Sequence, residues 1–279
     1  MIVNLNGVLI STAMARIDPT DRGFTLGDGL FETMRAYHDQ ILHLPAHLHR
    51  LRAGACVLRL PLSMTDAELC TRLHVTLAAS GLSTAVLRLT VSRGPAGRGL
   101  LPPTPVTPTI LITASPLSPP YRPVEAIIAT ATRRNQHSPL SRIKSLNALD
   151  NMLARQEAAD RGVEEALLLN TAGRLAETTV ANVFLVTEGG IVQTPPVADG
   201  ALPGIMRADV MTRLGAVETS LVPEDLFRAT EVFVTNALGV RPLVAVDCQP
   251  VGSATRVQEI LARGLHDAEN VAYTSSSSV

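Results

Sequence analysis

Residues 138–147 read Ser-Pro-Leu-Ser-Arg-Ile-Lys-Ser-Leu-Asn, and they contain the only lysine of the 279-residue chain. Every other basic residue among the 24 lysines and arginines is an arginine. Arginine can replace lysine in ion pairs and at phosphates, but its pKa above ~12 prevents it from acting as a neutral amine nucleophile. A desolvated lysine amine forms Schiff bases with carbonyl compounds. Lys144 is therefore a candidate for imine chemistry, and the alternative is a leftover surface lysine.

Two further segments fit the chemistry of a pyridoxal phosphate site. Glu177 lies in Leu175-Ala-Glu-Thr-Thr-Val-Ala-Asn-Val-Phe184, and a carboxylate aimed at a pyridine nitrogen would keep that nitrogen protonated. The stretch Leu202-Pro-Gly-Ile-Met-Arg207 opens an expected helix, whose first N–H groups and positive dipole end can receive a phosphate. The alternatives are a surface glutamate and an ordinary Pro-Gly helix start.

The composition is that of a folded protein with no dedicated nucleic-acid surface. Hydrophobic residues make up 46 % of the chain and charged residues 18 %, and the formal net charge is −1. An ordered core is expected from the apolar fraction, whereas phosphate contacts along a nucleic acid would need a basic surface. We therefore expect a small-molecule substrate and no nucleic acid.

The cysteines and the apolar segments indicate the cellular location of the protein. Cys56, Cys70 and Cys248 are far apart and form no CxxC pair, so neither a disulfide framework nor a zinc ribbon is expected. No run of ~18 apolar residues predicts a membrane span, and residues 1–10 lack the features of a signal peptide. The expectation is a cytoplasmic protein with no membrane partner.

Four prolines in residues 115–123 mark the expected domain boundary, because such a cluster continues neither a helix nor a central strand. We predict a first domain over 1–115, a linker over 116–124 and a second domain over 125–272. The serine-rich end, 273–279, is expected to be a frayed tail.

Hydrophobic periodicity predicts the regular elements within both domains. Strands are expected at 85–92, 109–114, 126–130, 165–169, 182–187 and 231–235, and helices at 45–60, 146–161 and 204–214. Gly162 and Gly215 are expected to end the last two helices. The sequence thus predicts an α+β chain.

Taken together, these segments resemble the fold-type IV, or class IV aminotransferase-like, pyridoxal phosphate enzymes. The resemblance spans about residues 6–246. It includes Asp21-Arg-Gly-Phe-Thr-Leu-Gly-Asp-Gly-Leu-Phe-Glu-Thr-Met-Arg35 and His47-Leu-His-Arg-Leu51, followed in family order by the segments around Lys144, Glu177 and residue 202. The resemblance implies a small N-terminal α/β domain, a larger C-terminal pseudo-barrel domain, pyridoxal 5′-phosphate between them, and a homodimer that shares active-site loops.

The resemblance also implies roles for individual residues. Lys144 would carry the cofactor as a Schiff base and move the proton, and Glu177 would pair with the pyridinium nitrogen. The phosphate would be bound by Arg50, by the backbone N–H groups of Ile205 and Met206, and by a second loop that contains Asn236 and Ala237.

Within this group the chain is most similar to 4-amino-4-deoxychorismate lyases. Asn236-Ala-Leu238 matches their N-A-L or N-S-L, whereas aminotransferases usually place small hydroxyl residues there. Ser92-Arg-Gly-Pro-Ala-Gly-Arg-Gly-Leu100 follows the lyase pattern S-R-G-x-x-G-R-G-Y. Phe31 and Leu100 replace the tyrosine and histidine of D-amino-acid transaminases. Arg98 is the expected carboxylate clamp, since a guanidinium binds carboxylates bidentately; its alternative is a surface arginine.

Three positions depart from the family pattern. Ala148 and Leu149 stand where a tyrosine is common, Leu100 replaces the lyase tyrosine, and the turn between 231 and 242 is one residue short. In the lyase, Thr33 would orient a proton near the leaving group; a strand threonine with local hydrogen bonds is the alternative. The other activity left open is a transaminase that acts on a D-amino acid, a branched-chain amino acid or an R-amine.

Other classes of protein find less support. His43, His47 and His49 could suggest a metal site, but no HExxH arrangement exists and Pro45 is expected to interrupt the helix. We therefore interpret these histidines as solvated or capping side chains and expect no metal. The chain has no G-x-S-x-G elbow, Walker A motif or Rossmann fingerprint. A catalytically inactive binding module is disfavoured because Lys144 and Glu177 are both present.

Overall fold

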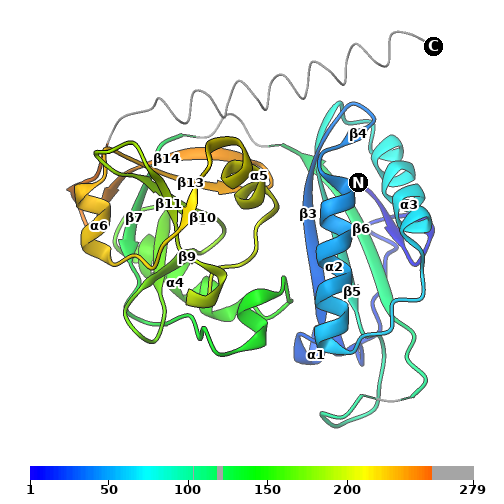
Figure 1. Ribbon diagram of the computed structural model, residues 1–279. Helices are drawn as coiled ribbons and strands as arrows, with labels where there is room; N and C mark the ends of the chain where they lie inside the picture. Colours follow the sequence, from blue (N-terminus) through cyan, green and yellow to red (C-terminus); the bar gives the residue numbers. More distant parts are fainter. Residues whose placement is uncertain (103, 118–121, 253–279) are drawn as a thin grey trace. The chain divides into compact units, whose positions relative to one another are not determined.

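The computed structural model describes residues 1–102, 104–117 and 122–252. The chain forms two compact units (Figure 1), and each is discontinuous in sequence. The first unit comprises Met1–Ser118 and Ile143–Asn147, and the second comprises Pro119–Arg142 and Ala148–Val279. The domains expected from sequence were single stretches, so the return of the lysine-bearing segment to the first unit was not foreseen. The expected tail over 273–279 lies outside the described residues.

The first unit is built on a fully antiparallel sheet with the strand order β2-β1-β6-β5-β3-β4. Its strands are β1 (Ile2–Leu5), β2 (Val8–Ser11), β3 (Gly29–Tyr37), β4 (Gln40–Ile41), β5 (Thr84–Ser92) and β6 (Thr109–Pro116). Its helices are α1 (Arg22–Leu26), α2 (Leu44–Leu58) and α3 (Asp66–Ser80).

Helices α2 and α3 cover one face of this sheet (Figure 1). Alternation along β3 directs Leu30 and Met34 into the core beneath the helices, where Leu48 and Leu51 of α2 also lie. Because side chains alternate between the two faces of a strand, Phe31 and the other odd-numbered residues of β3 face away from α2. Candidate site residues of β3 therefore lie on one face of the strand, and the residues packed beneath α2 lie on the other.

The second unit is built on a nine-stranded sheet with the order β12-β11-β10-β13-β14-β7-β8-β9, and β15 pairs with β14. Its strands are β7 (Val124–Ile128), β8 (Glu165–Leu169), β9 (Leu175–Thr178), β10 (Asn182–Val186), β11 (Val192–Thr194), β12 (Val217–Glu218), β13 (Glu231–Asn236), β14 (Gly239–Val246) and β15 (Gln249–Pro250). The helices are α4 (Leu149–Asp160), α5 (Ile205–Leu214) and α6 (Pro223–Arg228), with short 3₁₀ turns at Pro139–Arg142 and Val197–Asp199.

This sheet is curled around a single inner core. Leu167 of β8, Leu175 of β9, Val183 of β10 and Val234 of β13 belong to one apolar cluster, although several strands separate β9 from β10 in the order of pairing. On the outer faces, α4 and α5 cover the alternate residues, including Phe184. The expected fold class, a small α/β domain and a larger pseudo-barrel domain, is confirmed.

Two element boundaries differ from the predictions. The helix expected from residue 146 begins at Leu149, because the preceding segment is extended: Ser145 forms an antiparallel bridge with Leu30, and Leu146 donates its backbone N–H to Gly29 of β3. Strand β6 continues through Pro116, inside the cluster expected to exclude strands. Pro116 pairs with Ala85 of β5 only, since the pairing with β1 ends at residue 113. The missing N–H of Pro116 therefore removes no ladder hydrogen bond.

The expected interruption of the helix by Pro45 is wrong. Pro45 lies in the first turn of α2, which begins at Leu44, where the missing N–H has no helical partner in any case. Among the described residues, no helix is both long enough and apolar enough to span a bilayer.

Candidate functional site

The lysine segment is bound along β3. The N–H of Phe31 donates to the carbonyl of Lys144 at 2.9 Å, and the N–H of Leu146 donates to Gly29 at 3.0 Å. A Cβ at Gly29 would come within 2.5 Å of the Val91 carbonyl oxygen and 2.7 Å of Leu146 Cδ1. Glycine is therefore required for this close approach, and it allows the backbone of the segment to be fixed by a strand.

Lys144 and an unforeseen arginine lie over the same aromatic ring. The Nζ atom of Lys144 is 4.5 Å from the centroid of the Phe31 ring, and Cζ of Arg88 is 3.8 Å from it. Nearby protein atoms lower the pKa of Arg88 by removing part of its hydration, although a guanidinium stays protonated. No carboxylate pairs with Arg88 in the described part of the chain. Arg88 is thus available to an anionic group next to the lysine.

Thr33 belongs to the same group of side chains. It is half-buried in β3, two residues from Phe31, and it pairs across the sheet with Arg88 of β5. Cross-strand partners project on the same face. The structure thus brings together Lys144, Phe31 and Thr33 from the prediction and adds Arg88 to them.

Arg50 of α2 is engaged with a buried carboxylate. Its Nε donates to Oε1 of Glu32 at 2.8 Å, and its Nη2 donates to Oε2 at 2.6 Å. His47 of α2 lies 2.7 Å from the same Oε2 through Nδ1. The expectation that His47 is solvated or capping is wrong, because it is 1 % exposed. His43 does occupy the N-cap position of α2, without a side-chain capping bond.

The loop that carries Arg98 and Leu100 is exposed but anchored. Leu100 is 83 % exposed, and Arg98 makes no hydrogen bond or ion pair with the residues that the structure describes. The guanidinium of Arg22 donates to the carbonyls of Gly99 and Leu100 at 2.9 and 2.7 Å, and to Asp28 at 2.8 Å. The loop backbone is therefore held in place, while the Arg98 side chain is exposed.

Glu177, in β9 of the second unit, is a buried carboxylate paired with an arginine. Its Oε1 is 2.9 Å from Nη2 of Arg134, and its Oε2 accepts the backbone N–H of Leu202 at 2.9 Å. The same N–H belongs to the loop that leads into α5, so the carboxylate and the helix start are fixed together. Arg134 also reaches the carbonyls of Gly200 and Ser141.

The start of α5 has the properties of an anion site. Ile205 and Met206 are its first two residues, and the N-cap residue, Gly204, provides no side-chain capping bond. A Cβ at Gly204 would come within 2.1 Å of Oδ1 of Asn182, so only glycine fits beside that amide. The first N–H groups of a helix have no partner within it and can bind a phosphate.

Asn236 and Ala237 lie at the hairpin between β13 and β14. Asn236 pairs with Gly239, which leaves Ala237 and Leu238 as a two-residue turn. Oδ1 of Asn236 accepts the N–H of Leu238 at 2.9 Å, so this side chain stabilises the turn itself. Any contact of this hairpin with a phosphate would use its backbone.

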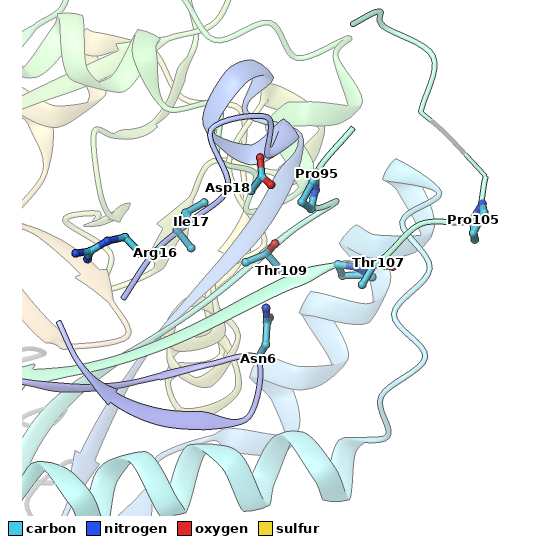
Figure 2. Close-up of a pocket in the computed structure, with 9 residues that line it drawn as sticks. Asn6, Arg16, Ile17, Asp18, Pro95, Pro105, Thr107 and Thr109 are labelled. Carbon is cyan, nitrogen blue, oxygen red and sulfur yellow. The ribbon is translucent and has the colours of Figure 1, made fainter. Parts of the chain in front are cut away.

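A surface cavity of about 430 Å³ in the first unit contains none of the predicted site residues (Figure 2). Asn6, Arg16, Asp18 and Thr109 are among its lining residues. Asp18 accepts hydrogen bonds from Thr20, and Arg16 donates to the carbonyls of Ala13 and Ala15. These charged groups are thus bound to neighbouring chain segments, and we assign the cavity no role.

Sequence reasoning missed four polar residues of these groups: Glu32, His47, Arg88 and Arg134. Glu32 could have been found had the strand at Gly29–Tyr37 been predicted, because a charged residue among apolar even-numbered positions of a strand has to meet a partner in the core. Arg88 and Arg134 carry no such signal. In the described residues no group of three or more His, Cys, Asp or Glu side chains could hold a metal ion.

Comparison with curated proteins gives relatives in two groups, aminotransferases and a lyase. A Methanocaldococcus jannaschii protein named as a candidate branched-chain-amino-acid aminotransferase is 35 % identical over 257 residues, which cover 88 % of each chain. The D-alanine aminotransferase of Bacillus licheniformis is 30 % identical, with 91 % of each chain covered. The aminodeoxychorismate lyase of Bacillus subtilis is 28 % identical, with 90 % of this chain and 89 % of its own covered.

Solved structures give the same two groups. The branched-chain aminotransferase of Escherichia coli superposes with a TM-score of 0.87 at 25 % identity, with 95 % of this chain and 92 % of its own covered. A candidate 4-amino-4-deoxychorismate lyase of Legionella pneumophila superposes with a TM-score of 0.84 at 28 % identity, with 92 % and 96 % covered. A further branched-chain aminotransferase, from the source abbreviated T.th., has a TM-score of 0.84 at 25 % identity over 94 % and 92 % of the two chains, and was solved with pyridoxamine 5′-phosphate.

The family described as amino-transferase class IV matches residues 29–246. This range includes β3, the lysine segment, Glu177, the start of α5 and the β13–β14 hairpin. It thus agrees with the resemblance seen in the sequence motifs. The chain belongs to the class IV aminotransferase family of fold-type IV enzymes.

Proposed function

We propose that this enzyme converts 4-amino-4-deoxychorismate to 4-aminobenzoate and pyruvate, with pyridoxal 5′-phosphate attached to Lys144. The cofactor follows from the family, since relatives of this fold were solved with pyridoxamine 5′-phosphate and with a phosphopyridoxyl-glutamate adduct. The family does not decide between lyase and transaminase, so the proposal of a lyase depends on the residues around Lys144.

Each unit, taken by itself, contains groups that suit one part of this cofactor. The first unit contributes the amine of Lys144 and the guanidinium of Arg50. The second contributes the carboxylate of Glu177 and the N–H groups of Ile205 and Met206, beside a glycine that tolerates no side chain. When bound, pyridoxal phosphate supplies an aldehyde for the substrate amine and a protonated ring that withdraws electrons.

The chain's own groups then move the protons. Once the substrate amine has replaced it, the Lys144 amine removes the proton from the carbon that bears the substrate nitrogen. Loss of the neighbouring enolpyruvyl ether yields pyruvate and an aromatic ring, and Lys144 displaces the 4-aminobenzoate product. The hydroxyl of Thr33 is suited to orient a proton near the leaving group, because Thr33 lies two residues from Phe31 on the same face of β3.

The single observation that carries the proposal is the placement of Lys144 and Arg88 over one phenylalanine ring. A substrate carboxylate can bind this guanidinium, which has no acidic partner among the described residues, beside the Lys144 amine. 4-Amino-4-deoxychorismate carries both an amine and carboxylates.

A transaminase of the same fold is the second candidate. It is favoured by the relatives named as aminotransferases, including the one at 35 % identity. In that reaction the same Lys144 would move the proton to the cofactor, and a keto acid would accept the amine. The absence of hydroxyl side chains at Phe31, Ala237 and Leu238 favours the lyase.

The deciding experiment supplies 4-amino-4-deoxychorismate without any keto acid and assays both products over many turnovers. Sustained equimolar release of pyruvate and 4-aminobenzoate supports the lyase, because no amino acceptor is then required. Release of neither product, together with bleaching of the bound cofactor by an amino acid and recovery on adding a keto acid, supports the transaminase.

We also propose, from the family resemblance, that the active form is a homodimer with shared active-site loops, and, from the cysteine pattern and the start of the sequence, that it is cytoplasmic. Light scattering of the purified holoenzyme tests the oligomeric part directly. A monomeric mass at full activity would contradict it.

A further inference from the structure

Glu32 is a buried carboxylate whose two oxygens are both bound by helix α2. Its side chain is 1 % exposed. Oε1 accepts Nε of Arg50 at 2.8 Å, while Oε2 accepts Nη2 of Arg50 at 2.6 Å and faces Nδ1 of His47 at 2.7 Å. His47 and Arg50 are three residues apart, so the helix presents both on one face. The carboxylate therefore contacts the guanidinium at two nitrogens, in a forked arrangement.

Stability alone does not account for this group. The neighbouring buried residues, such as Leu30, Met34 and Leu51, are aliphatic, and a buried ion pair is often no more stabilising than apolar side chains of the same volume. A bidentate contact does have one definite effect, which is to fix the plane of the guanidinium. Arg50 is 11 % exposed, so an otherwise flexible arginine is held in one orientation.

The charges of the three groups follow from their surroundings. Burial acts to raise the pKa of Glu32, but the hydrogen bonds from Arg50 and His47 outweigh it and leave that pKa below its usual value. Burial lowers the pKa of His47. At neutral pH, His47 is therefore an uncharged donor, and Glu32 is an anion that offsets the charge of Arg50. What Arg50 offers a ligand is then a fixed direction for its N–H groups more than net charge.

We propose that Glu32 is a positioning residue for the phosphate of the cofactor: it holds the Arg50 guanidinium in the orientation that binds phosphate, and His47 holds Glu32. This inference rests on one part of the proposed function, namely that Arg50 binds the phosphate of pyridoxal phosphate. A lysine at position 50 would keep the charge but could not form the fork.

The test compares pyridoxal phosphate with pyridoxal, which has the same ring and aldehyde but no phosphate. Each is titrated into cofactor-depleted protein, and the dissociation constant is obtained from the visible absorbance of the lysine-bound form. For Glu32→Gln we expect the affinity for pyridoxal phosphate to fall about 10- to 100-fold, as expected for losing one or two charge-assisted hydrogen bonds. The affinity for pyridoxal should stay unchanged.

The same helix provides a matched control. Arg52 and Asp66 form an Arg–carboxylate pair at 2.8 Å whose side chains are 32 % and 57 % exposed. Asp66→Asn removes that pair without touching Glu32, and both dissociation constants should keep their wild-type values. Arg50→Lys should reproduce the effect of Glu32→Gln, and the double variant should bind no more weakly than Arg50→Lys, because the two residues act as one unit.

Two results would overturn the proposal. One is an equal loss of affinity for both compounds in Glu32→Gln, which indicates a structural role; the other is wild-type protein that binds pyridoxal as tightly as pyridoxal phosphate. If Glu32→Gln does not fold, His47→Gln is the alternative, because it removes one contact to Oε2 and leaves the ion pair. We expect this variant to lose several-fold in affinity for pyridoxal phosphate alone. An equal loss of affinity for pyridoxal would contradict the proposal. The ratio of the two dissociation constants does not depend on the reaction catalysed, so this test remains valid if the lyase assignment is wrong.

Discussion

Each compact unit buries one glutamate against one arginine, and the two pairs are built in opposite senses. In the first unit both oxygens of Glu32 are bound by α2, and the glutamate supports Arg50. In the second unit Arg134 also binds the carbonyls of Gly200 and Ser141, and the arginine supports Glu177. The same pair of residue types can thus prepare a cation for an anionic ligand or an anion for a cationic one.

We assign Arg50 and Glu177 to the cofactor, and we assign Glu32 and Arg134 to their support. On this assignment, substitutions of the two glutamates affect different quantities: binding of the phosphate for Glu32 and the rate of proton removal for Glu177.

The largest effect is expected from Lys144→Ala, because both pairs are assigned to a cofactor bound through this residue. The variant should lose the visible absorbance and the adduct trapped by borohydride, since the chain has no second lysine. Absorbance spectra and intact-protein mass after reduction measure both. As a control, Arg142→Lys added to Lys144→Ala should restore neither. A trapped adduct in Lys144→Ala would show that the cofactor is not bound through Lys144, and the assignment of both pairs to that cofactor would then fail.

Glu177→Gln tests the second pair. An uncharged amide cannot hold a ring nitrogen protonated, so the turnover number should fall about 100-fold or more, as for loss of one preorganised charge. The affinity for pyridoxal phosphate should change far less, in contrast to Glu32→Gln. Arg134→Gln is the companion variant, and leaving a buried carboxylate without its partner should cost about 3 kcal/mol of stability. A similar loss of phosphate-dependent affinity in Glu32→Gln and Glu177→Gln would break the comparison.

Arg88→Gln asks whether the first unit binds anions at a second place. We expect the KM for a carboxylate substrate to rise about 10-fold or more, since a charge-assisted contact is lost, while the affinity for pyridoxal phosphate stays unchanged. Arg88→Lys should lie between wild type and Arg88→Gln, because a lysine keeps the charge but stacks less well on Phe31. Steady-state kinetics measure this, and an unchanged KM in Arg88→Gln would exclude Arg88 from substrate binding.

The smallest effect concerns pH. Burial lowers the pKa of His47 in the folded protein, so its contribution to stability is complete above the unfolded value near 6.5 and declines as the pH falls below it. Glu32 and Asp28 also have lowered pKa values, against burial, because of their arginine contacts. Their contributions are complete above about 4.5 and decline at lower pH.

Urea midpoints measured at pH 8, 6 and 5 should therefore decrease with acidification, and His47→Gln should flatten the part of the curve between pH 6.5 and 5. An identical slope in wild type and variant would show that folding does not shift the pKa of His47, and a steeper slope in the variant would show that its pKa is raised; either result contradicts a pKa lowered by burial.

Local patterns predicted most of the fold. The strands at 165–169 and 182–187 and the helix that follows Gly204 were predicted to within a residue or so, because their apolar spacing matches the faces they bury. The start of α4 could not be predicted, since it depends on a hydrogen bond between Leu146 and a strand more than 100 residues earlier. Periodicity contains no information about such a partner.

The site residues that could be predicted are likewise those identified by local sequence, and the residues that were missed depend on distant contacts. Lys144 and Glu177 were selected by their chemistry and by their neighbours in sequence, and the structure places both in ordered, buried or half-buried surroundings. The contacts of His47 and Arg134 could not be predicted, because each side chain pairs with a residue far away in the chain. His47 was expected to be solvated or to cap a helix, since helical spacing alone does not tell which face of a helix meets a buried carboxylate.

The return of Ile143–Asn147 to the first unit has a consequence for biosynthesis. A ribosome finishes residues 1–118 well before it makes Ser145, the partner of Leu30 in an isolated bridge. The first unit therefore lacks the contacts of this segment with β3 until residues 119–142, which belong to the second unit, have been translated. Lys144, to which we assign the cofactor, is among the last residues of the first unit to be made. A gene fragment that ends at residue 118 would encode the sheet and helices of the first unit without this lysine.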